Sequence, residues 1–277
     1  MAINAELAGK TYDPITFEYT NKDTILYALG VGSGPDELKF VFENDLKVLP
    51  TFGVVPSFPA ASAPMGELNV NPMMVVHGEQ GITLHRPIPE SGTILTTATI
   101  DGIYDKGSGA VVLVKTASTD KKGTLLFEGT YSFFARGEGG FGGERGPSTP
   151  ATEYPDRDPD FRTDMATLPV QALIYRLSGD LNPLHADPGF AKIAGFDRPI
   201  LHGLCTYGLA GRALLRGACG GDPDKFKSFN ARFSGVVFPG DTLITEGWKA
   251  EKGKYLIRCK TQTGGVVLTN GVAVVEE

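Results

Sequence analysis

The sequence has few cysteines and few histidines, and both shortages exclude kinds of site. Its three cysteines, Cys205, Cys219 and Cys259, are odd in number and far apart, and 277 residues include four histidines. A structural zinc site needs ligands grouped at short spacings, and a disulfide framework needs paired cysteines. We therefore interpret the cysteines as ordinary buried thiols of a protein from a reducing compartment.

Long apolar runs and an excess of positive charge are also missing. No uninterrupted apolar run approaches the ~20 residues that cross a bilayer, and residues 1–14 lack the apolar core of a signal peptide. Lysine and arginine number 26 against 32 aspartate and glutamate, a formal net charge of −6. Because nucleic-acid-binding proteins usually have a basic balance, we expect neither a nucleic acid nor a membrane as a partner.

An internal repeat is present in this chain of ordinary globular composition. Three pairs of short segments match in the same order: 25–32 with 173–180, 75–78 with 200–203, and 91–95 with 240–244. Tyr27 falls on Tyr175, and Leu29 falls on Leu177. The pattern favours a duplicated domain, and the alternative is an unrelated two-domain α+β protein.

After the third match, both halves show alternating, β-branched runs separated by short turns that contain glycine. Such runs predict antiparallel hairpins. The expected strands are 93–104, 110–118 and 124–134 in the first half, and 242–249, 255–261 and 266–275 in the second.

Helical segments precede these hairpins, and the longest of them is expected at 201–215. Shorter ones are expected at 170–177 and from Asp187-Pro188, where the acid serves as N-cap and proline takes the first helical position. A helix lying across a curved antiparallel sheet buries the apolar faces of both elements. The predicted fold class is therefore α+β, with two such repeats at 1–136 and 164–277.

Between the repeats we expect a linker at 137–163, which is rich in glycine, proline and charge. It contains GEGGFG at 137–142, which formally matches a dinucleotide-binding fingerprint. That motif has meaning only where a helix follows to receive the phosphates. The next residues, 144–150, read ERGPSTP and cannot form one, so we discount the match.

The stretch YRLSGDLNPLH at 175–185 places an acid, Asp180, five residues before an imidazole, His185, among apolar neighbours. The first repeat keeps the apolar residues that surround this stretch but has Gly32 at the position of Asp180, and no histidine follows within five residues. Asn182-Pro183 favours a turn, which would bring both side chains to one cavity wall. An acid beside an imidazole supports proton transfer near neutral pH, so together the two can activate one water.

Other interpretations of this pair remain open. Asp180 can be a helix cap, and His185 can be a buried core residue whose ring nitrogens are hydrogen-bonded. A metal site is a third reading, with His202 as the only nearby additional ligand. The segment 198–203 leads into the long helix, and an unpaired amide at Gly203, near the helix start, can stabilise an oxygen that gains negative charge, although a glycine needed for close packing explains that position equally well.

These residues resemble a known family. The stretch at 175–185, with FDRPILHG at 196–203 and RFSGVVFPGDT at 232–242, closely resembles the signature of 2-enoyl-CoA hydratase 2, the (R)-specific hydratase of the MaoC-like group. The resemblance covers essentially the whole chain and looks most like the hydratase region of peroxisomal multifunctional enzymes type 2. It implies a double hot-dog fold, with a degenerate first repeat that binds the substrate and a catalytic second repeat.

The resemblance implies reversible hydration of trans-2-enoyl-CoA to (3R)-3-hydroxyacyl-CoA in fatty-acid β-oxidation, without metal or redox cofactor. It makes Asp180 and His185 the catalytic pair, with Asn182 helping to position water and the Gly203 amide binding the thioester oxygen. The degenerate first repeat would supply room for a long acyl chain. Substrate contacts implied by the resemblance are His77, Gly78, Lys106, Leu181, Pro183, Leu184 and Phe233.

The contacts to CoA, the assembly and location of the protein, and two rival functions remain to be considered. Lys106 lies in an expected hairpin turn, where it can reach a CoA phosphate, and Arg176 and Arg232 are looser candidates. A homodimer, fusion to a dehydrogenase region and a peroxisomal location are implied, although the chain ends AVVEE without a peroxisomal tripeptide. Rival functions are a hot-dog acyl-CoA thioesterase and a non-catalytic acyl-CoA-binding module.

Overall fold

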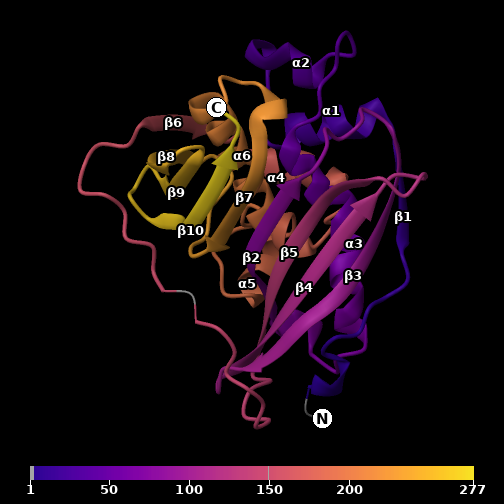
Figure 1. Cartoon of the computed structure of the whole chain (residues 1–277). Coiled ribbons are helices and arrows are strands. Elements are labelled where there is room, and N and C mark those ends of the chain that lie inside the picture. The colour runs from indigo at the N-terminus through magenta and orange to yellow at the C-terminus, as the bar shows by residue number, and fades with distance from the viewer. Residues whose placement is uncertain (1–2, 149) are drawn as a thin grey trace.

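A computed structural model describes residues 3–148 and 150–277, and within them ten strands form one continuous antiparallel sheet (Figure 1). Residues 1–2, in the expected first repeat, and residue 149, in the expected linker, lie outside the described residues. In chain order the strands are β1 (Ile15–Tyr19), β2 (Val75–Leu84), β3 (Gly92–Asp105), β4 (Gly109–Thr119), β5 (Leu125–Arg136), β6 (Phe161–Ala166), β7 (Phe226–Phe233), β8 (Thr242–Glu251), β9 (Lys254–Thr261) and β10 (Val266–Val275).

The order of the strands across the sheet shows the duplication directly. From one edge to the other it runs β1-β3-β4-β5-β2-β7-β10-β9-β8-β6. Each half has the same internal order, and the central strands β2 and β7 join the halves with a register from Glu79↔Arg232 to Thr83↔Ser228. The predicted fold class, α+β with two repeats of a helix across an antiparallel sheet, is confirmed.

The six hairpin strands expected from the alternating runs are all present, and four further strands were not expected. β1, β2, β6 and β7 lack the tight glycine turns that identified the others. β6 begins at Phe161, so the last three residues of the range expected as linker belong to a strand.

One helix from each repeat covers the sheet. α6 packs against β6, β7 and β8, while the shorter α3 packs against β3, β4 and β5. Proline inside a helix removes a backbone hydrogen bond, and α3 contains Pro59. The helices are α1 (Asn21–Gly30), α2 (Leu38–Val41), α3 (Val54–Ser62), α4 (Gln171–Tyr175), α5 (Pro188–Ile193) and α6 (Gly203–Ala218). No helix of the described residues is both long and apolar enough to cross a membrane.

One of the three sequence matches was wrong. The match of 75–78 with 200–203 pairs the start of strand β2 with the start of helix α6. In the sheet, β2 corresponds to β7, so α3 corresponds to α6. A four-residue match, with two identities and two similar apolar residues, is too short to establish which segments of the repeats correspond, whereas the order of the strands in the sheet does establish it. His77 and His202 are therefore not equivalent.

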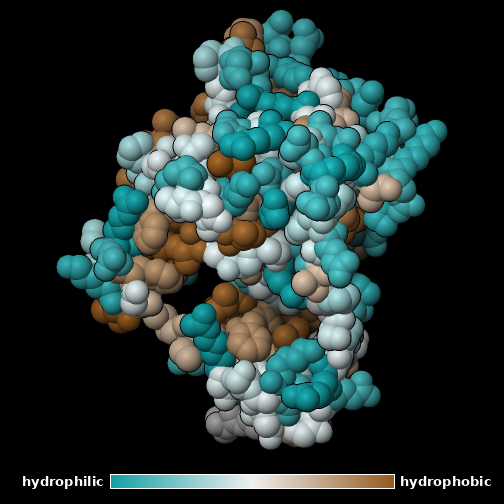
Figure 2. Space-filling model, turned by 90° about the vertical axis from the view of Figure 1, so that its left-hand side faces the viewer, coloured by the Kyte–Doolittle hydropathy of each residue, from teal (hydrophilic) through white to brown (hydrophobic). Residues whose placement is uncertain are grey.

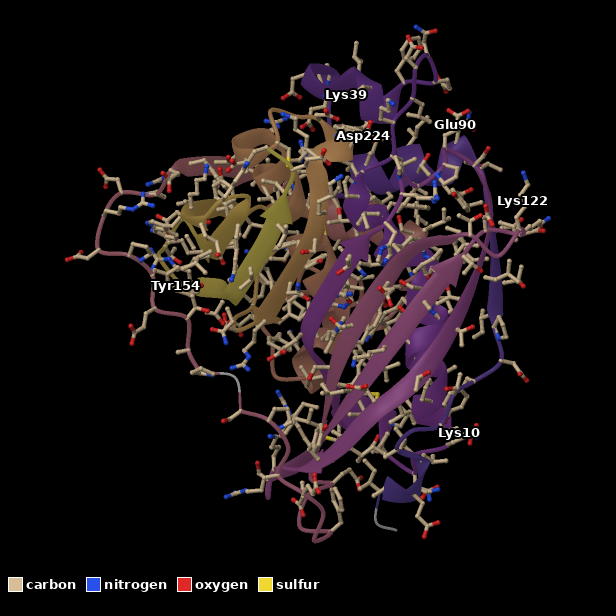
Figure 3. The ribbon with its side chains drawn as sticks, viewed as in Figure 1. Lys10, Lys39, Glu90, Lys122, Tyr154 and Asp224 are labelled. Carbon is tan, nitrogen blue, oxygen red and sulfur yellow. The ribbon has the colours of Figure 1, made fainter. Side chains whose placement is uncertain are left out.

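The segment between β5 and β6 crosses the outside of the molecule, and Figure 2 shows hydrophobic side chains gathered in a hollow on the side that it crosses. Tyr154 lies beside the second half of the sheet (Figure 3) and donates to the Ile257 carbonyl at 3.0 Å. The Asp105 carboxylate accepts N–H bonds from Gly107, Gly140 and Gly142. The GEGGFG stretch therefore folds back on the β3–β4 turn and opens no helix.

Candidate active site

The segment between α4 and α5 is shaped by its short polar residues. A single 3₁₀ turn after α4 ends at Gly179, whose φ of +120° strongly disfavours a side chain. The Asp180 carboxylate accepts the Asn182 N–H at 3.2 Å, and the Asn182 side chain accepts the Leu184 N–H at 3.0 Å. These local bonds turn the chain twice and return His185 towards Asp180.

His185 is 8% exposed and has a defined tautomer. Its Nδ1 lies 2.9 Å from the Ile200 carbonyl oxygen. Because a carbonyl only accepts, Nδ1 carries the proton and Nε2 keeps its lone pair. Burial lowers the pKa of His185 below its ordinary 6.5, although the Ile200 bond and the Asp180 charge oppose the shift. The ring is therefore a neutral proton acceptor near neutral pH.

The structure brings the two predicted residues together. A carboxylate oxygen of Asp180 and a ring nitrogen of His185 lie within 4.8 Å of each other, and a ring nitrogen of His202 lies within the same distance of both. Asp180 is partly exposed, so solvent can reach it. One water can hydrogen-bond to a carboxylate and an imidazole at that separation.

The three side chains also form the group in which a metal site is conceivable, so its geometry needs testing. The rings of His185 and His202 are stacked, with centroids 3.7 Å apart and planes 27° apart. Zinc binds in the plane of each imidazole at ~2.0–2.1 Å, and lone pairs of nearly parallel stacked rings do not converge at that distance. The arrangement therefore fits a metal ion poorly.

Gly203 is the first residue of α6, with His202 as N-cap. Amides of a first helical turn have no partner within the helix and carry partial positive charge. A Cβ at Gly203 would lie 3.2 Å from the Phe233 ring, so this ring packs closely against the Cα of Gly203. Glycine here therefore permits the close packing of Phe233, as the alternative explanation of this position expected, while the Gly203 N–H remains the first amide of α6.

His77 and Gly78 reach the same place from the first repeat. The register of β2 shifts between His77 and Glu79, a β-bulge that leaves Gly78 out of the ladder. His77 lies edge-on to Phe233, with ring centroids 5.1 Å apart, and its Nε2 donates to the Glu79 carbonyl at 3.0 Å. Burial among aromatic rings such as Tyr131 lowers the pKa of His77 to about 4, so this ring is neutral.

The remaining predicted substrate contacts have a less direct relation to the Asp180–His185 pair. Leu181 is 59% exposed beside Asp180, and Pro183 and Leu184 form the 3₁₀ turn that leads to His185. Lys106 lies in the β3–β4 turn, where its ammonium donates to the carbonyl oxygens of Arg145 and Pro147. The structure does not bring Lys106 into contact with the Asp180–His185 pair.

The two looser arginine candidates also differ. Arg232 forms an ion pair with Glu79 at 2.6 Å across the central strands, so it already has a partner. The buried Nε of Arg176 has no hydrogen-bond partner within the described part of the chain.

An apolar pocket that sequence reasoning missed adjoins Asp180, with a volume of about 50 Å³. The loop that follows the first helix of each repeat faces the sheet-covering helix of the other repeat. After α1, Gly32 lies against Leu209 and Arg212 of α6. After α4, Gly179 and Asp180 face α3. Because α3 is short, space remains on that side. The apolar, proline-containing sequence of α3, VVPSFPAAS, was the available signal. The pocket is lined by Phe17, Val54, Val55, Phe58, Pro59, Tyr175, Ser178, Gly179, Asp180 and Leu204.

A larger cavity of about 240 Å³ lies elsewhere, at the far ends of β2 and β7. Two of its lining residues, Glu90 and Asp224, appear at the end of the molecule opposite the N-terminus in Figure 3. His85 of that lining is exposed and pairs with Glu128, whereas His185 is buried beside Asp180 and the start of α6, so the smaller pocket is the candidate site.

Comparison with known proteins identifies the family. The MFE-2 hydratase 2 N-terminal domain matches residues 17–137, and the MaoC like domain matches residues 150–272. The 3-hydroxyacyl-thioester dehydratase Y of Mycobacterium tuberculosis is 48% identical over 93% of this chain and 91% of its own. The chain belongs to the hydratase 2 family of MaoC-like proteins.

Other members of the hydratase 2 family agree in sequence and structure. The probable enoyl-CoA hydratase 2 of Dictyostelium discoideum is 44% identical over 95% of this chain and 93% of its own. A MaoC-like dehydratase from Phytophthora capsici superposes with a TM-score of 0.88 at 35% identity, covering 99% of this chain and 98% of that one.

Some relatives are much longer. The peroxisomal multifunctional enzyme type 2 of Mus musculus is 42% identical over 95% of this chain, which spans 37% of that protein. The family resemblance predicted from the 175–185 stretch is thus confirmed, and the hydratase unit also occurs inside longer polypeptides.

Proposed function

We propose that this protein is a hydro-lyase that reversibly hydrates trans-2-enoyl-CoA to (3R)-3-hydroxyacyl-CoA in fatty-acid β-oxidation. The observation that carries the proposal is the approach of the Asp180 carboxylate and the neutral His185 ring to within 4.8 Å, beside the start of α6, where the Gly203 amide has no partner within its own helix. The enoyl-CoA hydratase names of the family's members support the substrate class.

The chemistry follows from the thioester, whose carbonyl polarises the double bond and makes C3 electrophilic. Water held between Asp180 and His185 attacks C3 while His185 Nε2 takes one of its protons, and negative charge collects on the thioester oxygen beside the Gly203 N–H. The imidazolium, stabilised by the Asp180 charge, then returns a proton to C2. The enzyme ends in its starting protonation state, so the step is balanced without a cofactor.

The apolar pocket beside Asp180 supports a site for the acyl chain. Its first-repeat wall comes from α3 and Phe17, and its second-repeat wall includes Tyr175 and Leu204. Burial of each methylene is worth ~0.8 kcal/mol, so an apolar pocket beside the short helix α3 favours substrates whose acyl chain is long enough to enter it. We propose that the first repeat sets the chain-length preference.

Wider context is proposed from the relatives. The peroxisomal names of several family members support a peroxisomal location, and hot-dog proteins commonly pair through their sheets, which supports a homodimer. The longer relatives support a dehydrogenase region as covalent neighbour. Light scattering of the purified chain tests the dimer: a mass of about 29.5 kDa, that of one chain, contradicts it.

Product analysis tests the proposal against its rivals. The protein is incubated with trans-2-decenoyl-CoA, and three quantities are followed: enoyl-thioester absorbance, free thiol, and the configuration of the 3-hydroxyacyl product on a chiral column. We expect loss of absorbance, no thiol, and the (3R) product. Release of thiol would show a thioesterase, binding without turnover would show a carrier, and (3S) product would contradict the stereochemical assignment.

A chelator tests the absence of a metal. Because the stacked histidines fit a metal poorly, we expect dialysis against EDTA to leave the rate unchanged. Loss of activity that returns with zinc would contradict the water activation proposed for the pair.

A further inference from the structure

His202 contacts both members of the proposed catalytic pair, yet the proposed mechanism gives it no task, and the stacked rings fit poorly with the metal-ligand role considered from the sequence. We propose that His202 is a positioning residue, which holds the Asp180 main chain by a hydrogen bond and fixes the plane of the His185 ring by stacking on it. The proposal rests on the proposed function for its kinetic consequences, but its structural part can be tested without turnover.

The hydrogen bond fixes the loop. His202 Nε2 lies 3.1 Å from the Asp180 carbonyl oxygen, a partner 22 residues away in the chain. Because that oxygen only accepts, Nε2 carries the proton. The other bonds that shape the loop at Asp180 and Asn182 are local, within two residues. The bond from His202 therefore ties the loop to the body of the protein.

The stacked rings fix the imidazole of His185. Their centroids are 3.7 Å apart, and the Tyr175 ring lies 4.9 Å from that of His202. His185 must donate from Nδ1 to Ile200, whereas His202 donates from Nε2 to Asp180, so the two rings hold opposite neutral tautomers. His202 shields one face of His185 from water.

His202 itself is held rigidly. It is 1% exposed and is the N-cap of α6, directly before Gly203. The Thr206 hydroxyl donates to its carbonyl at 3.3 Å. The N-terminus of α6 thus sets the position of the Gly203 amide and, through His202, of Asp180 and His185.

Burial favours the neutral forms of both rings. Burial, followed by the charge that His185 would carry and by Arg176, lowers the pKa of His202 to about 3, while the bond to Asp180 opposes the shift. The titratable and charged groups that act on the two rings or pack against them are Asp180, Arg176 and Tyr175. A second imidazolium in contact with the first would be repelled, so His202 stays neutral and keeps its Nε2 proton.

Three variants separate the two contacts. His202→Gln keeps a donor near the Nε2 position and loses the ring, His202→Phe keeps a stacked ring and loses the donor, and His202→Ala loses both. Misplacement of a catalytic group by ~1 Å can cost about a hundredfold. We expect His202→Ala to lower kcat about tenfold to a hundredfold with KM within about threefold, and each of the other variants to retain part of the lost rate.

The pH profile gives a readout that a merely structural role would not move. Water admitted by His202→Ala should raise the pKa of His185 towards its ordinary 6.5, so the acid limb of kcat/KM should move to higher pH. In His202→Phe the ring still excludes water and the limb should stay in place. His85→Ala, at an exposed histidine paired with Glu128, is the matched control and should change nothing.

Nitrogen-15 NMR of the four histidines tests the structural part on the resting protein. We expect His185 with its proton on Nδ1 and His202 with its proton on Nε2. If His202 carries its proton on Nδ1, or if folded His202→Ala keeps wild-type kcat and an unmoved acid limb, the proposal is wrong. Absence of hydratase turnover in the wild-type protein would instead overturn the proposed function, and leave the tautomers as the test of positioning.

Discussion

Substituting Gly203 by alanine is a sharp perturbation of the proposed oxyanion site. The added Cβ would lie 3.2 and 3.3 Å from two Phe233 ring atoms, so the ring must yield by a few tenths of an ångström. Phe233 is only partly buried at the end of β7 and can move. Alanine also favours a helix over glycine by about 1 kcal/mol. We therefore expect the free energy of unfolding to change by less than about 1 kcal/mol.

Activity should fall much further. Loss of one oxyanion donor costs about a hundredfold to a thousandfold in kcat, or ~2.7–4 kcal/mol. The alanine variant keeps its N–H, but its methyl group lies next to this donor and displaces Phe233, a predicted substrate contact. We therefore expect a loss of about tenfold to a hundredfold in kcat/KM.

The assay is enoyl-thioester absorbance with trans-2-decenoyl-CoA, beside thermal unfolding of the same samples. Gly208→Ala is the control, because its Cβ would meet Val31 at 2.5 Å and the Tyr27 hydroxyl at 2.8 Å, away from the pair. It should lose stability, about 1–3 kcal/mol, while its folded fraction keeps its kcat. A folded Gly203→Ala variant with wild-type kcat/KM would show that the added methyl group does not obstruct the Gly203 N–H, and would refute the steric reasoning behind this prediction.

Three further predictions concern stability, pH and chain length. Glu37→Gln leaves buried Arg212 without the carboxylate that it contacts at 2.5 Å, so urea unfolding should show a loss of about 3–5 kcal/mol. Burial alone would raise the pKa of Glu37, but bonds from Arg216 and Arg212 outweigh it and lower the pKa, so this stability is lost as pH falls through the folded pKa, below 4.5. Because the pKa of His185 is lowered, the acid limb of the wild-type kcat/KM profile should lie below pH 6.5. Val55→Trp should reduce kcat/KM for trans-2-decenoyl-CoA at least about tenfold and spare crotonyl-CoA.

Matched controls accompany the stability and chain-length predictions. Asp36→Asn removes the exposed partner of Arg216 and should cost at most about 1 kcal/mol. Val274→Trp adds the same bulk on an exposed face of β10 and should change neither substrate. Equal loss on both substrates in Val55→Trp would argue against an acyl-chain role for the pocket.

The sequence predicted much of the fold because hairpins are local. Runs such as 266–275 combine alternation with a glycine turn, and strand pairing follows from adjacency in the chain. The central pairing of β2 with β7 joins residues about 150 positions apart. Neither strand is flanked by a tight glycine turn from which the pairing could be predicted. The same gap led to the mistaken match of His77 with His202.

The candidate site likewise has a part that local sequence predicts and a part that it does not. Asp180 and His185 lie five residues apart with turn-forming residues between them, so their approach was predictable from the chain. The pocket wall from α3 and the stacking of His202 on His185 depend on how distant segments pack. No spacing in the sequence encodes such contacts.

The most direct test of the account is turnover by the two single variants Asp180→Asn and His185→Ala, each shown to be folded by its thermal transition. Two groups that share one water and each supply about a hundredfold to ten-thousandfold in rate predict that either change abolishes most of the hydration of trans-2-decenoyl-CoA. If both folded variants hydrate this substrate at the wild-type rate, the pair does not perform the reaction.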